Sequence, residues 1–130
     1  MQAWINHIQG ITQINSIALI IENMTSVEII PAFLENHNIS RIDIYSSEKV
    51  RALDFRQKLK KEYRKRGIEA PVVFVYEYCF EKGIVDGNLK YDAVFFDSNV
   101  NYQTVMSLKS FSPNYFFGRI WTDVVPYFDV

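Results

Sequence analysis

Short apolar runs, separated by longer amphipathic or polar stretches, constrain the fold of this chain more than any other feature. The runs occupy 17–21, 39–45, 72–76, 91–97 and 115–121. Continuous apolar runs of this length are typical of strands buried on both faces of a parallel sheet. The stretches between them carry apolar residues at helical spacing. The chain is therefore expected to alternate strands with helices.

Helices are expected at 2–13, 25–36, 47–66 and 101–110. Thr25 to Glu28 reads as a capping box, in which the first and fourth side chains satisfy backbone donors at the start of a helix. Ser47 is expected to cap the long helix, and Gly67 to end it in the left-handed conformation. The stripe predicted to be buried on this helix consists of Ala52, Phe55, Leu59 and Tyr63.

Alternating strands and helices form a parallel sheet covered on both faces, and right-handed crossovers leave few topologies. We expect an α/β, Rossmann-like, doubly wound and mostly parallel five-stranded sheet in the order 3-2-1-4-5, with a leading N-terminal helix. A chain of 130 residues accommodates one such domain, spanning 1–130. Sheets of this kind place their sites at the carboxyl ends of the strands, near the switch point between strands 1 and 4.

Composition excludes several classes of protein. Fourteen basic residues against fifteen acidic ones give a net charge of −1, which argues against a dedicated non-specific nucleic-acid binder, since that function needs a basic surface. One cysteine excludes an internal disulfide and a multi-cysteine zinc site. Apolar runs fall far short of the roughly 20 residues that span a bilayer, and polar residues interrupt the N-terminus where a signal peptide would be apolar. We expect a cytoplasmic protein with no membrane contact.

The segment 91–123 resembles the unit from the fourth to the fifth strand of class I S-adenosylmethionine-dependent methyltransferases. That unit has a strand ending in aspartate, a nearby tyrosine, a helix, a glycine and a strand followed by aspartate. Here these positions hold Asp97, Tyr102, Gly118 and Asp123. The resemblance implies S-adenosylmethionine as cofactor, with Asp97 and Asp123 as the catalytic residues. Some members hold Mg²⁺ with such a pair, but Val124 stands at the usual third ligand, so we expect no metal.

The sequence also departs from the family. The turn after the first strand, 22–25, has no glycine, although the cofactor requires a close approach of the backbone there. The second strand ends at 45–47 without a carboxylate to bind ribose. Val100 and Thr122 replace two histidines of the motif, and the chain ends at Val130 without the family's strands 6 and 7. These departures predict a degenerate, C-terminally short member.

Candidate cofactor-binding residues follow the first three predicted strands. They are Glu22, Asn23, Met24, Tyr45, Ser46, Glu77 and Tyr78. The acids and the tyrosines have an alternative interpretation, in which the acids are solvated loop residues and the tyrosines belong to the core. Asp97 and Asp123 have one too, in which Asp97 caps the next helix and Asp123 binds loop amides.

Two surface features concern partners. The basic run 58–66 reads either as a phosphate contact or as a solvated helix face, and the second interpretation is preferred. The aromatic segment 115–128 predicts a fifth strand that would be an exposed sheet edge if nothing covered it. Its cover could be the tail 124–130, the N-terminal helix or a second copy, and we expect a homodimer or a protein partner at this edge.

Two functions follow from these observations. The first is a methyltransferase-like domain that has lost catalysis and acts as an interaction or regulatory module. The second is a divergent S-adenosylmethionine-dependent methyltransferase that acts on a small molecule or a protein. A receiver domain is excluded, because its aspartate would follow the third strand, which here ends in Tyr76 and Glu77.

Overall fold

The computed structural model describes residues 14–22, 39–79, 81–84, 89–96, 100–111, 115–117 and 126–129. The helices expected at 2–13 and 25–36 lie outside these residues. The strands are β1 (Ser16–Ile20), β2 (Arg41–Ser46), β3 (Val72–Glu77), β4 (Ala93–Phe96), β5 (Tyr115–Phe117) and β6 (Pro126–Asp129).

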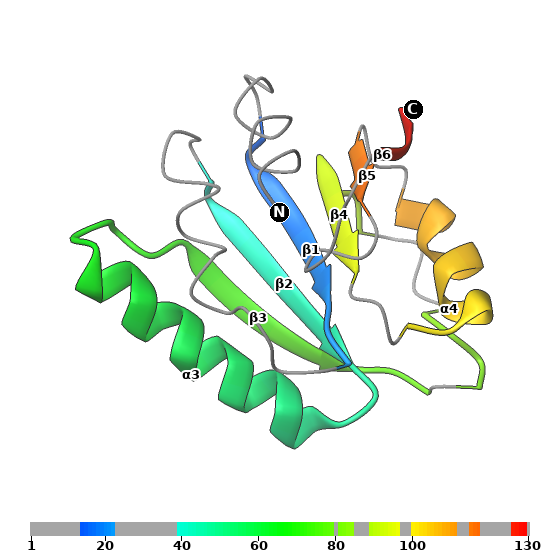
Figure 1. The fold of residues 1–130 in the computed structure, drawn as a ribbon, viewed down its shortest axis with the longest axis horizontal. Coiled ribbons are helices and arrows are strands. Elements are labelled where there is room, and N and C mark those ends of the chain that lie inside the picture. The colour runs from blue at the N-terminus through cyan, green and yellow to red at the C-terminus, as the bar shows by residue number, and fades with distance from the viewer. Residues whose placement is uncertain are drawn as a thin grey trace.

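One sheet contains all of these strands, in the order β3-β2-β1-β4-β5-β6 (Figure 1). Neighbours from β3 to β5 pair in parallel, whereas β6 pairs antiparallel with β5. The predicted parallel α/β sheet and the order 3-2-1-4 are confirmed. The predicted number of five strands is wrong, because a sixth described strand, β6, pairs antiparallel with β5.

β6 pairs with the side of β5 that faces away from β4. The tail 124–130 was one of three candidate covers, and β6 lies within it. Its first residue is Pro126, and proline is tolerated at the first residue of a strand because no ladder donor is needed there. The homodimer or partner expected at this end of the sheet stays a prediction.

Helix α3 (Lys49–Lys65) covers one face of the sheet. Its buried residues are the four predicted ones, and they pack against Ile42 and Ile44 of β2. Gly67 has a φ of 69°, as expected after the end of the helix. The prediction that Ser47 caps the helix is wrong. Glu48 holds the capping position without a side-chain bond, and the Ser47 hydroxyl donates instead to Glu22.

The other face carries helix α4 (Tyr102–Ser107) and the 3₁₀ helix η1 (Leu108–Phe111). Leu108 and Phe111 are fully buried in a cluster with side chains of β1, β2 and β4. Tyr102, the tyrosine of the family motif, is 77% exposed because it lies at the outer start of α4. Neither α3 nor α4, the α-helices in the described ranges, is long and apolar enough to span a membrane.

Candidate functional site

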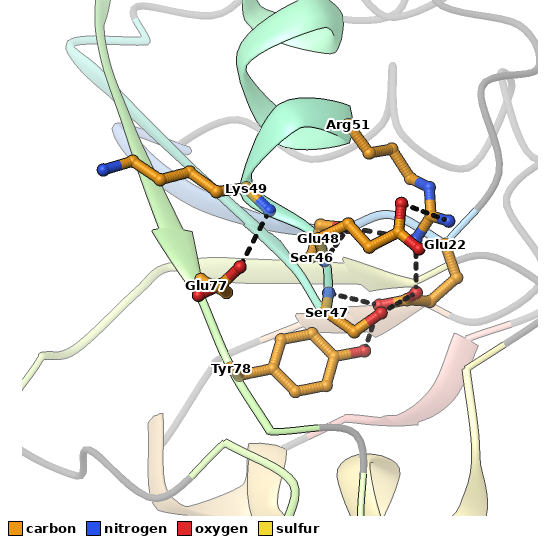
Figure 2. A network of polar contacts seen from close by, with 8 residues as sticks. All are labelled: Glu22, Ser46, Ser47, Glu48, Lys49, Arg51, Glu77 and Tyr78. Atoms are coloured by element: carbon orange, nitrogen blue, oxygen red, sulfur yellow. Dashed lines mark hydrogen bonds and ion pairs between the residues drawn. The ribbon is translucent and has the colours of Figure 1, made fainter.

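Polar side chains gather where β1, β2 and β3 end. The parallel register aligns Ile20, Tyr45 and Tyr76 across the three strands, so the residues that follow them lie close together. Glu22 comes from β1, residues 46–47 from β2, and residues 77–78 from β3. Figure 2 shows these side chains meeting beneath the start of α3. We call this group the strand-end network.

Glu22 is the centre of the strand-end network. Its Oε1 accepts from the Ser47 backbone N–H at 2.9 Å and from the Tyr78 hydroxyl. Its Oε2 accepts from the Ser47 hydroxyl at 2.7 Å and from Arg51 Nη1 at 2.8 Å. A carboxylate offers about four acceptor positions. This side chain, only 5% exposed, therefore has its acceptor capacity filled by the protein itself.

Arg51 joins the helix to the strands. Besides Glu22, its Nη1 donates to the Ser46 hydroxyl oxygen at 3.3 Å, and its Nη2 lies 3.3 Å from Oε2 of Glu48. Ser46 is fully buried, and its oxygen also accepts from the Glu48 N–H at 3.2 Å. Ser46, one of the predicted cofactor residues, is thus used in fixing the start of α3.

Glu77 supports the same helix from β3. Its Oε2 accepts from the Lys49 backbone N–H at 3.1 Å (Figure 2). The first N–H groups of a helix have no partner within the helix, and a carboxylate there is favoured by the helix dipole. Glu77 therefore supplies from another strand the cap that the preceding residues do not provide.

The tyrosines of the predicted site belong largely to the core. Tyr45 is 3% exposed and Tyr78 is 8% exposed, so the core interpretation holds for both. The Tyr45 ring stacks on Tyr76 with centroids 4.9 Å apart and an interplanar angle of 18°. The Tyr45 hydroxyl lies 2.7 Å from the Tyr91 hydroxyl, and both are buried.

A second buried polar group was missed in the sequence. Asp43 lies in the middle of β2 and is fully buried. Its Oδ1 accepts from Arg41 Nε at 2.9 Å, and its Oδ2 accepts from the Tyr91 hydroxyl. Arg41 Nη2 donates in turn to the Tyr76 hydroxyl at 3.0 Å. The alternation Arg41, Asp43, Tyr45 along one face of β2 was the available signal.

Burial and hydrogen bonding perturb this second group. Burial raises the pKa of the Tyr91 hydroxyl far above its ordinary value, and the bonds to Asp43 and Tyr45 add to the effect. The hydrogen bond to Asp43 raises the pKa of Arg41. The tyrosine therefore stays protonated and donates, and the arginine stays charged. These are the properties of a structural network rather than of a group that exchanges protons near neutral pH.

A hollow of about 310 Å³ lies beside the strand-end network. It is lined by Tyr45, Tyr76, Glu77, Tyr78, Cys79, Lys82, Gly83 and Ile84. Gly83 closes a turn with Cys79 at a φ of 73°, and a Cβ there would lie 3.0 Å from Ser107 Oγ. The turn is therefore pressed against α4, which fixes one wall of the hollow.

Four predicted site residues lie outside the described residues: Asn23, Met24, Asp97 and Asp123. The arrangement of the predicted catalytic pair therefore stays a prediction. Within the described ranges, no group of three or more histidine, cysteine, aspartate or glutamate residues could hold a metal ion.

Comparison with known proteins identifies the fold. No family model and no curated protein matches the sequence. Among solved structures, a SAM-dependent methyltransferase from Thiobacillus denitrificans, in complex with S-adenosyl-L-homocysteine, is similar with a TM-score of 0.56 and 12% identity. The chain has a methyltransferase-like fold. The match covers 90% of this chain but 46% of that protein, so the chain spans less than half of its length.

Proposed function

We propose that this chain is a methyltransferase-like domain that does not transfer methyl groups and acts as an interaction module. The observation that carries the proposal is the filled carboxylate of Glu22. In this fold the carboxyl ends of the first strands are where a nucleotide-like ligand binds. Here the acid that follows β1 is bound by Ser47, Arg51 and Tyr78 instead.

The other described candidates support the same proposal. Glu77 accepts from the backbone of α3, Ser46 is fully buried, and Tyr45 is paired with Tyr91. Each polar group would have to leave a partner in the protein before it could bind a cofactor. Leaving such a partner unpaired costs about 1–3 kcal/mol per buried group, and more where the group is charged. A ligand would therefore have to offset several such losses.

Thermal unfolding in the presence of S-adenosylmethionine or S-adenosyl-L-homocysteine tests the proposal. A ligand that binds only the folded state at 100 times its dissociation constant adds about 2.7 kcal/mol to the free energy of unfolding. We expect no shift of the Tm with either ligand at millimolar concentration. A shift of several degrees that saturates in the micromolar range would refute the proposed loss of cofactor binding.

A divergent methyltransferase is the second candidate, and two observations favour it. The similar solved structure is of a methyltransferase with S-adenosyl-L-homocysteine bound. The hollow beside Tyr45 and Tyr76 also offers two stacked rings at the correct end of the sheet. If this candidate is right, replacing Tyr76 with alanine weakens cofactor binding. A cofactor that binds equally well to that variant would exclude the hollow as its site.

A further inference from the structure

β3 is an edge strand of the described sheet, and half of its backbone N–H and C=O groups point away from β2. The Val72 N–H donates to Ser40 and the Tyr78 N–H donates to Ser46, both at 3.1 Å, so the even-numbered residues of β3 face β2. Alternate residues of a strand direct their N–H and C=O groups to opposite sides. The N–H and C=O groups of Val73, Val75 and Glu77 therefore point outward. No other described strand pairs with them.

Within the described residues, the strand itself lacks several features that usually protect an edge. Natural edge strands are short, bulged, or carry lysine or proline along the strand, which prevents pairing with other chains. β3 has six residues, reads Val-Val-Phe-Val-Tyr-Glu, and pairs with β2 without a register shift. On the face opposite α3, Val72 is 57% exposed and Phe74 is 44% exposed. A mainly apolar surface, with the Arg41 guanidinium 4.5 Å from the centroid of the Phe74 ring, thus accompanies the outward backbone groups.

Helix α3 adds a row of cations beside this edge. Arg51 points toward β1, because it binds Glu22, which follows that strand. The residues on the opposite side of α3, half a turn from Arg51, therefore point toward β3 and past its outer side. They are Lys49, Leu53, Arg56 and Lys60, which we call the α3 flank. Figure 1 shows α3 alongside β3, and Figure 2 shows the Lys49 side chain extending past β3, away from Arg51.

The α3 flank matches the strand in length and is not neutralised. Lys49 to Lys60 spans about 16 Å at 1.5 Å per residue, close to the roughly 20 Å of a six-residue strand. Among the described residues, Arg56 and Lys60 form no ion pair, whereas Lys58 pairs with Asp54 at 3.1 Å. Arg56 and Lys60 also line a hollow of about 600 Å³, together with Val50, Leu53, Asp54 and Gln57.

We propose that the β3 edge and the α3 flank together bind an extended peptide segment of a partner protein as an added antiparallel strand, with acidic side chains facing α3 and apolar side chains facing Phe74. Val73, Val75 and Glu77 supply the backbone bonds, as in other cases of strand addition. The peptide side chains directly opposite these residues lie on the α3 face of the sheet, where Arg56 and Lys60 favour acidic side chains. The peptide side chains between them lie on the other face and cover Val72 and Phe74.

Charge argues for this occupant over a second copy of the chain. If β3 paired with itself about a two-fold axis, the two α3 flanks would face each other, and Arg56 would meet its own counterpart. Like charges brought together at an interface are unfavourable. An acidic strand removes that repulsion and neutralises both cations. The inference deepens the proposed interaction role and rests on it.

The probe is a fluorescein-labelled nine-residue peptide of alternating valine and glutamate, compared with one of alternating valine and lysine. Anisotropy titrations of the full chain at low salt are expected to show binding of the glutamate peptide, with the lysine peptide at least about tenfold weaker. Methylation of the glutamate nitrogens, which face β3, is expected to abolish binding. Methylation of the valine nitrogens, which face solvent, is expected to leave it within about threefold.

A charge-reversal pair tests the α3 flank. R56E/K60E is expected to reverse the preference between the two peptides. The matched control K61E/K65E makes the same change on the outer side of α3, where Lys61 and Lys65 are exposed. It is expected to change either affinity by less than about threefold, because its charges lie farther from the edge. Equal effects of the two double variants would overturn the proposal.

Two further results would overturn it. One is equal binding of the glutamate and lysine peptides. The other is a dimer of the free chain, seen by sedimentation, that Val75→Pro dissociates, because a second copy would then hold the edge. The Tm shift with S-adenosyl-L-homocysteine is measured separately. A cofactor that binds together with the glutamate peptide would refute the loss of the cofactor site and leave the peptide site standing.

Discussion

Replacing Glu22 with glutamine tests the strand-end network at its centre. The substitution keeps the shape of the side chain and removes its charge. One of the two oxygens becomes an NH₂ group, which donates and cannot accept. Turned one way, the NH₂ group meets the Ser47 N–H and the Tyr78 hydroxyl, and turned the other way it meets the Ser47 hydroxyl and Arg51. A hydroxyl can reverse and accept from the NH₂ group, but the Ser47 N–H and Arg51 can only donate. At least one of the four hydrogen bonds is therefore lost and opposed, and the ion pair with Arg51 is lost in either orientation.

The magnitude follows from burial. A hydrogen bond to a charged group contributes about 1.5–3 kcal/mol, and breaking a buried ion pair costs about 3–5 kcal/mol. The Glu22 side chain is 5% exposed, but that of Arg51 is 24% exposed, so water compensates the arginine in part. We expect a loss of about 3 kcal/mol in the free energy of unfolding. For a chain of this size that corresponds to a fall in Tm of about 10 °C.

Urea denaturation followed by circular dichroism measures this loss, with an unchanged m-value as the check on two-state unfolding. Glu48→Gln is the matched control, because Glu48 also pairs with Arg51 but its side chain is 67% exposed. Its expected cost is below about 0.5 kcal/mol, as for surface ion pairs. A loss below about 1 kcal/mol for Glu22→Gln, or equal losses for both variants, would refute the reasoning.

Three other substitutions probe the rest of the molecule. Tyr63→Phe removes a buried hydroxyl that has no partner among the described residues, so stability at pH 7 should be unchanged or rise by up to about 1 kcal/mol. Burial raises the pKa of Tyr63 above its ordinary 10.0, so the folded state holds the proton more tightly than the unfolded state. The free energy of unfolding therefore falls as the pH rises above about 10. The variant should lessen that fall, as measured by urea titrations at alkaline pH. Tyr91→Phe leaves Oδ2 of buried Asp43 without its tyrosine donor and should cost about 2–3 kcal/mol by urea denaturation, and a cost near zero would contradict the assigned bond. Gly83→Ala should cost more than Gly67→Ala in thermal unfolding, because both glycines have positive φ but only Gly83 lacks space for a Cβ; equal costs would contradict the close contact with α4.

The periodicity of the sequence predicted the central part of the fold. Apolar runs identified β1, β3 and β4, the stretch 39–45 identified β2, and the spacing of Ala52 to Tyr63 identified the buried stripe of α3. β6 was not predicted as a strand, although the tail 124–130 that contains it was one of the candidate covers of the fifth strand. Pro126 is the first residue of this strand, which lies at one end of the sheet, where proline is tolerated.

The sequence predicted that residues at the ends of β1, β2 and β3 meet, but not which groups their side chains bind. Strand ends in a parallel sheet indicated that Glu22, Ser46 and Glu77 lie close together, since topology alone dictates it. That their polar groups bind one another and the start of α3 depends on side-chain geometry, which spacing does not encode. Asp43 was missed for a related reason. The alternation along β2 indicated which face of the strand Asp43 lies on, but its partner Tyr91 is 48 positions away in the sequence, so the pairing itself had no local signal.

Isothermal titration calorimetry of the full chain with S-adenosyl-L-homocysteine tests the central claim most directly. If the strand-end network occupies the polar groups that a cofactor would need, no heat of binding is expected with the ligand at millimolar concentration. A dissociation constant in the micromolar range would contradict the claim. It would also show that Glu22 gives up its partners to the ligand or that the ligand binds without it.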